Sequence, residues 1–295
     1  MSVVYLKAGH VQPVWAGHPW VFAQAIERVE GTPEPGGEVA VRDARGNVLG
    51  RGLYSPGSAI PVRLFTRDGS EAVDDALFVR RIAKALERRR MLGLPSVETN
   101  AVRLVHGEGD DLPGLVVDLL GNVLSVQVGT VGVHRHLDAI LDALEPVGAS
   151  AIVDRTSERA AKMEGFSPRR GILRGDPNLT AFQFRERGLE FQIPFELGQK
   201  TGFYVDQRPL RARIEELAKG RSVLDAYSYV GAFALAAARG GATRVTAVDS
   251  SGPAIEVGVD CARRNGLHER TIEIENTGST NDLVITDISL VGNDA

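Results

Sequence analysis

The feature that most constrains the fold is a regular alternation of helix-like and strand-like segments after Pro194. Strands that alternate with helices along a chain build a parallel sheet with helices on its faces, as in doubly wound α/β domains. Prolines begin two of the helical segments and glycines follow two of them, which matches the usual asymmetry of helix ends. The expected helices are 209–219, 231–239 and 253–265, and the expected strands are 222–226, 244–249 and 271–275.

The chain before Pro194 predicts two further domains of different classes. Residues 1–68 carry short runs of Val, Leu and Phe between Gly and Pro turns, which is typical of a small all-β barrel. Residues 101–193 mix strands with helices, and Gly121-Asn122 between two apolar runs predicts a β-hairpin. We therefore expect a multidomain α/β protein, with a β-barrel at 1–70, a central α+β domain at 71–193 and a parallel sheet at 194–295.

Composition and charge limit the partners of the chain. The net charge is -4 at pH 7 and the isoelectric point is about 5.9. No global basic field therefore marks a nucleic-acid partner, and any RNA site must be a local patch. The single cysteine, Cys261, and the lack of a long apolar run favour a cytoplasmic protein that does not enter a membrane.

A helix is expected at 74–91, because apolar side chains recur on one helical face while basic side chains occupy another. A solvated helix face is the first interpretation, since exposed Arg and Lys need no partner. A stripe that contacts RNA phosphates is the alternative. The candidate RNA-binding residues of this stripe are Arg80, Arg81, Lys84 and Arg88.

Two carboxylates follow consecutive strands of the expected parallel sheet. The first strand ends at Asp225 before a turn that contains Gly231, and the second strand ends at Asp249. Ligands of such sheets bind at the carboxyl ends of the strands, where a glycine lets the backbone approach closely and a carboxylate can bind ribose hydroxyls. The alternative is that Asp249, or Ser251, caps the helix that follows.

The same turn argues against a dinucleotide-binding protein. A dehydrogenase needs the pattern G-x-G-x-x-G there, and only Gly231 is present between Tyr229 and Phe233. Adenosine without a pyrophosphate is the better ligand, so a dehydrogenase is the least favoured function.

Three segments resemble one protein family. Residues 198–208, with the sequence G-Q-K-T-G-F-Y-V-D-Q-R, are similar to the G-Q-K-T-G-F-F-x-D-Q-R motif of the ribosomal RNA large-subunit methyltransferase I family. H-P-W-V-F at 18–22 with G-L-Y-S-P at 52–56, and E-G-D at 108–110 with L-P-G-L at 112–115, resemble the same family. The family reaction is methylation of C5 of cytosine in large-subunit ribosomal RNA, with S-adenosylmethionine as the cofactor.

The resemblance covers about residues 5–267. It implies an N-terminal PUA-type RNA-binding barrel, a central α+β domain and an incomplete Rossmann-like methyltransferase sheet. It further implies S-adenosylmethionine as the cofactor, large-subunit ribosomal RNA as the partner and no metal, and it leaves a homodimer open. Carried over by position, it places Lys200, Thr201, Phe203, Asp206 and Gln207 beside the cofactor, and Asp225, Tyr227, Ser228, Gly231 and Asp249 around its methionine and ribose.

Some of these residues have structural alternatives. Asp206 and Gln207 precede Pro209, so either is a candidate to cap the following helix. Phe203 is expected to pack in a core, because a single aromatic ring is more often a packing residue. Lys200 has no evident structural role.

The catalytic residue is left unassigned. Methylation of C5 needs a thiolate that adds to C6 of cytosine. In the family, an Asp-Pro-Pro segment follows the fourth strand and a cysteine further on supplies the thiolate; neither is found in this sequence, and the mid-helix Cys261 is interpreted as a packing residue. We therefore expect this chain alone not to produce 5-methylcytosine, and the alternative function is a non-catalytic or degenerate RNA-binding protein.

Residues 283–287, L-V-I-T-D, resemble the fourth strand of the family but follow 271–275 after only the residues 276–282. A parallel crossover needs about a dozen residues or more, whereas an antiparallel neighbour needs only a short loop. We expect 283–287 to pair antiparallel with 271–275 or to stay loosely attached.

Overall fold

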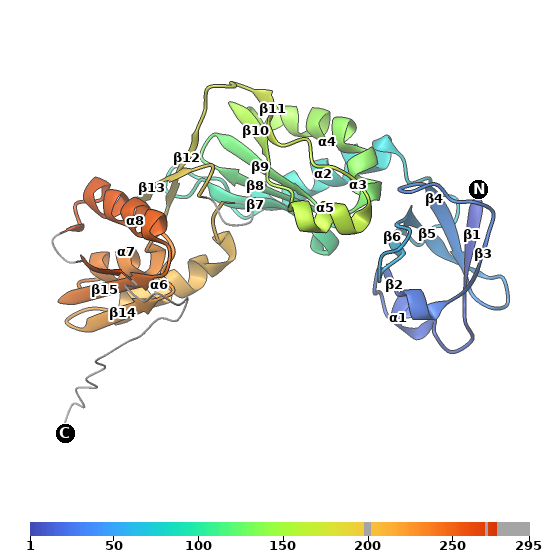
Figure 1. The fold of residues 1–295 in the computed structure, drawn as a ribbon, viewed down its shortest axis with the longest axis horizontal. Helices are drawn as coiled ribbons and strands as arrows, with labels where there is room; N and C mark the ends of the chain where they lie inside the picture. The colour runs from blue at the N-terminus through green and yellow to red at the C-terminus, as the bar shows by residue number, and fades with distance from the viewer. Residues whose placement is uncertain (198–201, 269–270, 276–295) are drawn as a thin grey trace. The chain divides into compact units, whose positions relative to one another are not determined.

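The computed structural model of the protein describes residues 1–197, residues 202–268 and the backbone of the strand at 271–275. Internal contacts divide the chain, drawn in Figure 1, into two compact units. Unit 1 is Met1–Arg185 with Gly198–Val205, and unit 2 is Glu186–Leu197 with Asp206–Ala295. The boundaries of the three expected domains stay a prediction, and the expected strand at 283–287 lies outside the described residues.

Unit 1 begins with a six-stranded sheet in the order β2-β6-β5-β4-β1-β3. β1 and β4 pair in parallel, and the other neighbours are antiparallel. The two-residue β2 is too short to close the sheet onto β3, so a half-barrel is found in place of the predicted barrel. The elements are β1 (Ser2–Leu6), α1 (Gln12–Trp15), β2 (Trp20–Val21), η1 (Ala23–Ala25), β3 (Ile26–Glu30), β4 (Glu38–Arg42), β5 (Val48–Tyr54) and β6 (Val62–Thr66).

A five-stranded sheet in the order β11-β10-β9-β8-β7 follows in unit 1. β8 and β9 form the hairpin predicted around Gly121-Asn122. Gly121 has a φ of +70°, and a Cβ atom there would lie 1.8 Å from the carbonyl oxygen of Gln183, so only glycine fits this turn. The elements are α2 (Asp75–Met91), β7 (Ala101–His106), η2 (Gly107–Asp110), β8 (Leu115–Leu120), β9 (Val123–Val128), α3 (Val131–Arg135), α4 (Leu137–Leu144), η3 (Glu145–Val147), β10 (Ala151–Asp154), α5 (Glu158–Glu164) and β11 (Gly171–Gly175).

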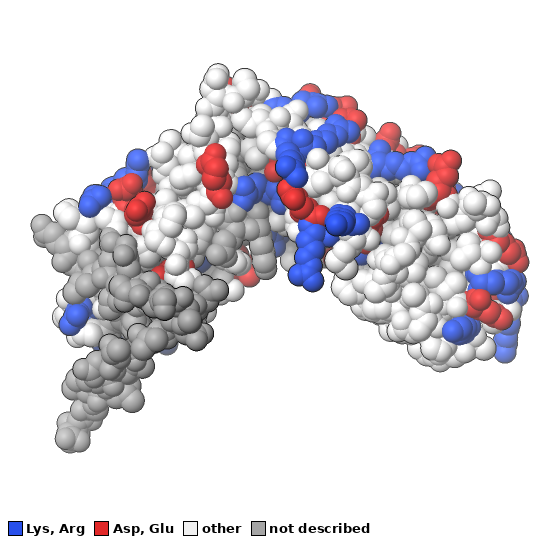
Figure 2. All heavy atoms as spheres, in the orientation of Figure 1, with Lys and Arg blue, Asp and Glu red and all other residues white. Residues whose placement is uncertain are grey.

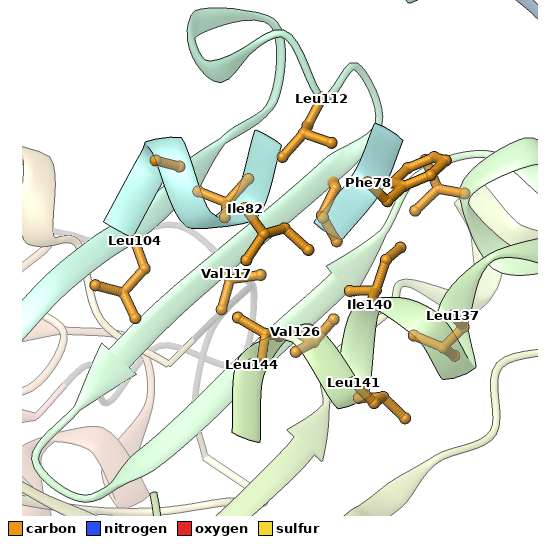
Figure 3. Packing of buried hydrophobic residues seen from close by; sticks show 14 of the residues in the cluster. Phe78, Ile82, Leu104, Leu112, Val117, Val126, Leu137, Ile140, Leu141 and Leu144 are labelled. Carbon is orange, nitrogen blue, oxygen red and sulfur yellow. The ribbon is translucent and has the colours of Figure 1, made fainter. Parts of the chain in front are cut away.

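The core of unit 1 lies between α2, α4 and one face of the five-stranded sheet (Figure 3). Phe78 of α2 and Ile140 of α4 pack there with Val117 of β8, and all three side chains are fully buried. Leu53 and Phe65 of the first sheet belong to the same cluster. The first sheet therefore contributes side chains to this core, while most of its apolar side chains form a separate cluster that includes Val4, Leu6 and Val39.

Arginines of α2 hold the loop that follows β7. Asp110 is 4% exposed and accepts hydrogen bonds from two guanidinium nitrogens of Arg89, both at 2.6 Å, from Arg88 at 3.0 Å and from the amide of His106 at 2.7 Å. Burial raises the pKa of this carboxyl, but the arginines and the amide outweigh burial, so its pKa lies below the usual value. The expected helix at 74–91 thus anchors this loop.

Unit 2 contains the parallel sheet that the helix–strand alternation predicts. In the described residues its order is β14-β15-β16, both pairs are parallel, and the alanines of α7 pack on it. Among the described residues of both units, no helix is long and apolar enough to cross a membrane. β12 (Ala181–Glu186) belongs to unit 1 except for Glu186, and η4 (Val205–Gln207) begins with the last residue of unit 1. The other elements of unit 2 are β13 (Leu189–Pro194), α6 (Arg208–Leu217), β14 (Ser222–Ala226), α7 (Ala232–Arg239), β15 (Arg244–Asp249), α8 (Gly252–Arg264) and β16 (Thr271–Glu275).

Asp110→Asn is expected to lower the free energy of unfolding by about 3 kcal/mol, because it leaves the guanidinium of Arg89 without its buried counter-charge. Urea unfolding of the variant and the wild type measures this difference. Glu71→Gln is the matched control: Glu71 pairs with the exposed Arg80, and its expected effect is below about 1 kcal/mol. Equal losses in the two variants would contradict the anchoring role of Asp110.

Candidate functional site

The carboxyl ends of β14 and β15 meet at one edge of the sheet. Ala226 is in register with Val248, and the chain after β14 turns so that the amide of Ser228 donates to the carbonyl oxygen of Val248 at 3.0 Å. Asp225 and Asp249 both lie at this edge. The structure therefore brings together the two carboxylates that the sequence predicts for ligand binding.

The turn between β14 and α7 has an unusual backbone. The φ angle is +60° at Tyr227, +53° at Tyr229 and +69° at Gly231. A residue other than glycine in this left-handed region costs about 1–3 kcal/mol and persists only where its surroundings hold it. Asp249 holds the turn, because its Oδ2 accepts the amide N–H of Tyr229 at 2.8 Å. The side chain of Tyr227, by contrast, is 80% exposed.

At the end of β15, the capping alternative is confirmed for Ser251. Ser251 caps α8, since its Oγ accepts the amide N–H of Ala254 at 3.3 Å. Asp249 is also bonded locally, because its Oδ1 accepts the amide N–H of Ser251 at 2.9 Å. An ionised carboxylate has about four acceptor sites, so two amides leave room for ligand hydroxyls. Ribose binding by Asp249 stays a prediction.

Asp225 lies half-buried beneath the turn, and its Oδ2 accepts the amide N–H of Ala234 in α7 at 3.0 Å. Burial is the main cause that raises the pKa of Asp225 to about 6; the carboxylate of Asp249 raises it as well, while the Ala234 amide and Arg211 lower it. A cation placed beside Asp225 would favour the ionised carboxylate. Protonation of this group is therefore coupled to any cationic ligand of the site.

A small apolar pocket lies beside the turn. Ser228 is 7% exposed, and its Oγ has no hydrogen-bond partner within the described residues. A buried hydroxyl without a partner is uncommon, so its presence indicates a place for a ligand or a water molecule. The pocket is lined by residues of the turn and of α8, which include Ser228, Tyr229, Gly231, Ile255, Gly258 and Val259.

The contribution of α8 to this pocket was not predicted from the sequence. A Cβ atom at Gly258 would lie 3.2 Å from the carbonyl oxygen of Val230, so the absence of a side chain lets the helix approach the turn. The available signal was the glycine itself, because a glycine inside a helix costs about 1 kcal/mol relative to alanine and usually has a packing reason. Ile255 and Val259 then form the apolar wall.

The other predicted cofactor residues are divided between the units. Phe203 belongs to unit 1, where it is 3% exposed and packs against Phe184 with ring centroids 4.9 Å apart, as the packing alternative predicts. Asp206 and Gln207 belong to unit 2, and the side-chain amide of Gln207 donates to Oδ2 of Asp206 at 3.3 Å. Gln207 occupies the cap position of α6 without a side-chain capping bond, so the capping alternative is wrong for Gln207. Lys200 and Thr201 lie outside the described residues.

The predicted RNA-binding stripe on α2 is used mostly within the protein. Arg80 pairs with Glu71 at 2.9 Å, and Arg88 holds the loop after β7. Arg81 donates to two backbone carbonyl oxygens, whereas Lys84 is exposed. RNA binding by this stripe stays a prediction, with fewer available cations than the sequence indicates.

Cys261 is a packing residue, as expected from its position in a helix. Its side chain is fully buried in α8. Burial raises the pKa of the thiol above its usual value, and the hydrogen bond with the backbone of Gln192 offsets only part of that increase. A neutral buried thiol is a poor nucleophile, which agrees with a packing role for Cys261.

Family models give the class of the protein. Residues 4–67 match the model of the PUA-like domain. Residues 102–274, more than half of the chain, match the model of the S-adenosylmethionine-dependent methyltransferase. The chain therefore has the fold of an S-adenosylmethionine-dependent methyltransferase with a PUA-like domain before it, and the cofactor predicted from the sequence is confirmed.

Relatives of known family narrow this class. The chain is 37% identical over 268 residues to ribosomal RNA large subunit methyltransferase I of Pseudoalteromonas translucida, covering 90% of this chain and 66% of that protein. It is 38% identical over 260 residues to the protein of the same name from Alteromonas mediterranea, covering 88% of this chain and 65% of that protein. The chain belongs to the ribosomal RNA large-subunit methyltransferase I family, as its three motifs predict, and it spans about two thirds of the length of these relatives.

Solved structures agree on the fold. A protein from Streptococcus mutans described as a SAM-dependent methyltransferase superposes with a TM-score of 0.80 at 20% identity, covering 93% of this chain and 70% of that one. A methyltransferase complexed with SAH superposes with a TM-score of 0.81 at 19% identity, covering 95% of this chain and 70% of that one. At these identities the likeness shows the fold alone.

The raised pKa of Asp225 predicts a pH dependence of stability. Its folded-state pKa of about 6 exceeds the value of about 3.9 in an unfolded chain, so the folded protein binds more protons between these values. The free energy of unfolding of the wild type therefore loses a contribution of about 2 kcal/mol as the pH rises from about 4 to about 6, and Asp225→Asn does not lose it. Urea unfolding at several pH values measures the difference, and a difference that is constant with pH would contradict it.

The buried Cys261 predicts a slow reaction with thiol reagents. In the native protein, labelling by a disulfide reagent is expected to be at least about 100-fold slower than in urea-unfolded protein, because the thiol is buried and protonated. Absorbance of the released chromophore measures both rates, and the unfolded protein is the control. Native labelling at the unfolded rate would show that Cys261 is accessible and reactive.

Proposed function

We propose that the protein is an S-adenosylmethionine-dependent methyltransferase of large-subunit ribosomal RNA, with C5 of a cytosine as the target of its family. We expect this chain alone not to complete the C5 reaction, because the family's Asp-Pro-Pro segment is not found in the sequence and Cys261, its single cysteine, is buried. The observation that carries the proposal is the carboxyl edge of β14 and β15, where a left-handed turn, two carboxylates and an apolar pocket with an unsatisfied hydroxyl lie together. The names of the relatives supply the ribosomal RNA substrate.

The residues at this edge fit the proposed cofactor. Asp249 is proposed to bind the ribose hydroxyls with its remaining acceptor sites, and Asp225 to bind the amino group of the methionine portion. The hydroxyl of Ser228, which has no hydrogen-bond partner among the described residues, fits a ligand held close to the backbone of the turn. When bound, the cofactor supplies an electrophilic methyl group on a sulfonium, and the role of these residues is to orient it for in-line transfer.

The proposal extends to partners and place. Large-subunit ribosomal RNA is the proposed partner, and the cytoplasm is the proposed location, because this RNA is processed there in bacteria like those of the relatives. Cys261, the single cysteine of the sequence, is buried, so it is not proposed as the catalytic residue. Transfer of a labelled methyl group from S-adenosylmethionine to large-subunit RNA separates the methyltransferase from a non-catalytic RNA-binding protein on the same scaffold.

Asp249→Ala is expected to weaken S-adenosylmethionine binding at least about tenfold, a free-energy loss of about 1.4 kcal/mol. The substitution removes the proposed ribose acceptor and the bond that holds the amide of Tyr229. Calorimetry with both proteins measures the two affinities. Asp260→Ala is the matched control, because it removes the same charge from an exposed ion pair of α8. Equal affinities of Asp249→Ala and the wild type would contradict the assignment.

A further inference from the structure

A groove on unit 1 concentrates basic side chains that the predicted site does not include. It lies along α5 and the segment that leads from α5 into β11. On the face drawn in Figure 2, Lys and Arg side chains gather over these elements. The side chains that line the groove include Glu158, Arg159, Lys162, Phe166, Pro168 and Arg170.

Local hydrogen bonds fix the shape of the groove. Ser157 caps α5, and Gly165 ends it with a φ of +80°, so the chain reverses and runs back beside the helix. Asp154 then holds the returning segment, because its Oδ2 accepts the amides of Arg169 at 3.0 Å and Arg170 at 3.1 Å. The groove is therefore a fixed feature of the backbone.

The charged side chains around the groove fall into two groups. Two guanidinium nitrogens of Arg169 donate to the two carboxylate oxygens of Asp138, at 2.6 and 2.8 Å. Arg170 forms an ion pair with Glu158. Arg159 and Lys162 are exposed, and neither forms an ion pair or hydrogen bond through its side chain in the described part of the chain. These two cations are available to a partner.

The acidic residues nearby leave the groove basic. Glu164, on the same helix, is 7% exposed and turns inward, where it accepts hydrogen bonds from Ser58 in the loop between β5 and β6 and from Arg63 of β6. Asp154 is occupied by backbone amides. The residues that line the groove therefore include one acidic side chain, Glu158, and three basic side chains, those of Arg159, Lys162 and Arg170.

We propose that this groove binds the phosphodiester backbone of single-stranded RNA, with Arg159 and Lys162 as the phosphate contacts. The inference rests on the proposed function, because it names a surface for the same RNA substrate. Arg159 and Lys162 are three residues apart on α5, so they lie on one helical face and can contact neighbouring phosphates. The ring of Phe166, which stacks on His134 at 4.6 Å, adds an aromatic wall of the kind that bases contact.

The groove is a better candidate than the stripe on α2 for an electrostatic reason. Arg80, Arg81 and Arg88 of that stripe already have partners within the protein. Moving them to a phosphate breaks an existing contact, whereas Arg159 and Lys162 exchange only water and counterions. In a protein of net charge -4, the available cations rather than their total number decide where RNA binds.

The test uses the full chain and a single-stranded oligoribonucleotide of mixed sequence. Fluorescence anisotropy at several salt concentrations gives the slope of log affinity against log salt for the wild type and for Arg159→Gln/Lys162→Gln. Loss of two phosphate contacts is expected to reduce the slope by about 1.4 and to weaken binding at low salt. Arg159→Lys/Lys162→Arg keeps both charges and is expected to retain the wild-type slope.

Arg263→Gln/Arg264→Gln is the matched control, because it removes two exposed charges at the end of α8 that is opposite to the β14–β15 edge. A groove variant that keeps the wild-type slope, or a control with an equal loss, would overturn the groove assignment. A wild type that binds no RNA would overturn both the groove and the RNA substrate. Calorimetry with S-adenosylmethionine on the same proteins tests the cofactor site separately, and the groove variant is expected to keep wild-type affinity.

Discussion

The site depends on one constraint: a left-handed turn after β14 needs acceptors for its backbone amides. Tyr227 and Tyr229 adopt a conformation that side chains other than glycine avoid. Asp249 compensates from the end of β15 by accepting the amide of Tyr229, and this is possible because parallel pairing brings the ends of the two strands together. The turn, the β14–β15 edge of the sheet and the pocket beside them therefore depend on the same contacts.

The same constraint explains the structural role of the two carboxylates. Asp225 is bonded to the first turn of α7 and Asp249 to the turn and to α8, so each stabilises the backbone before any ligand binds. Their proximity and the burial of Asp225 raise the pKa of Asp225 to about 6. A cationic ligand beside Asp225 would favour its ionised carboxylate, which couples binding at this edge to the protonation of Asp225.

Arginine has different uses in different parts of unit 1. On α2, Arg89 and Arg88 are committed to the buried Asp110, so a helix that looks like a basic surface in the sequence is mainly a structural anchor. On α5, Arg159 and Lys162 have no such partner in the described residues. Two helices that both carry basic side chains can thus differ in function, because the difference lies in the acidic groups that other segments bring to them.

The amino-acid sequence by itself determined the order of helices and strands in unit 2, the hairpin at Gly121-Asn122, the positions of Asp225 and Asp249 and the family. These features depend on local periodicity, turn residues and short motifs, which are legible within a few residues. Only the tertiary structure decided that the first sheet is a half-barrel, that Gly258 brings α8 against the turn, and which cations are available. Each of these depends on contacts between segments far apart in the chain, and such contacts leave little trace in local sequence.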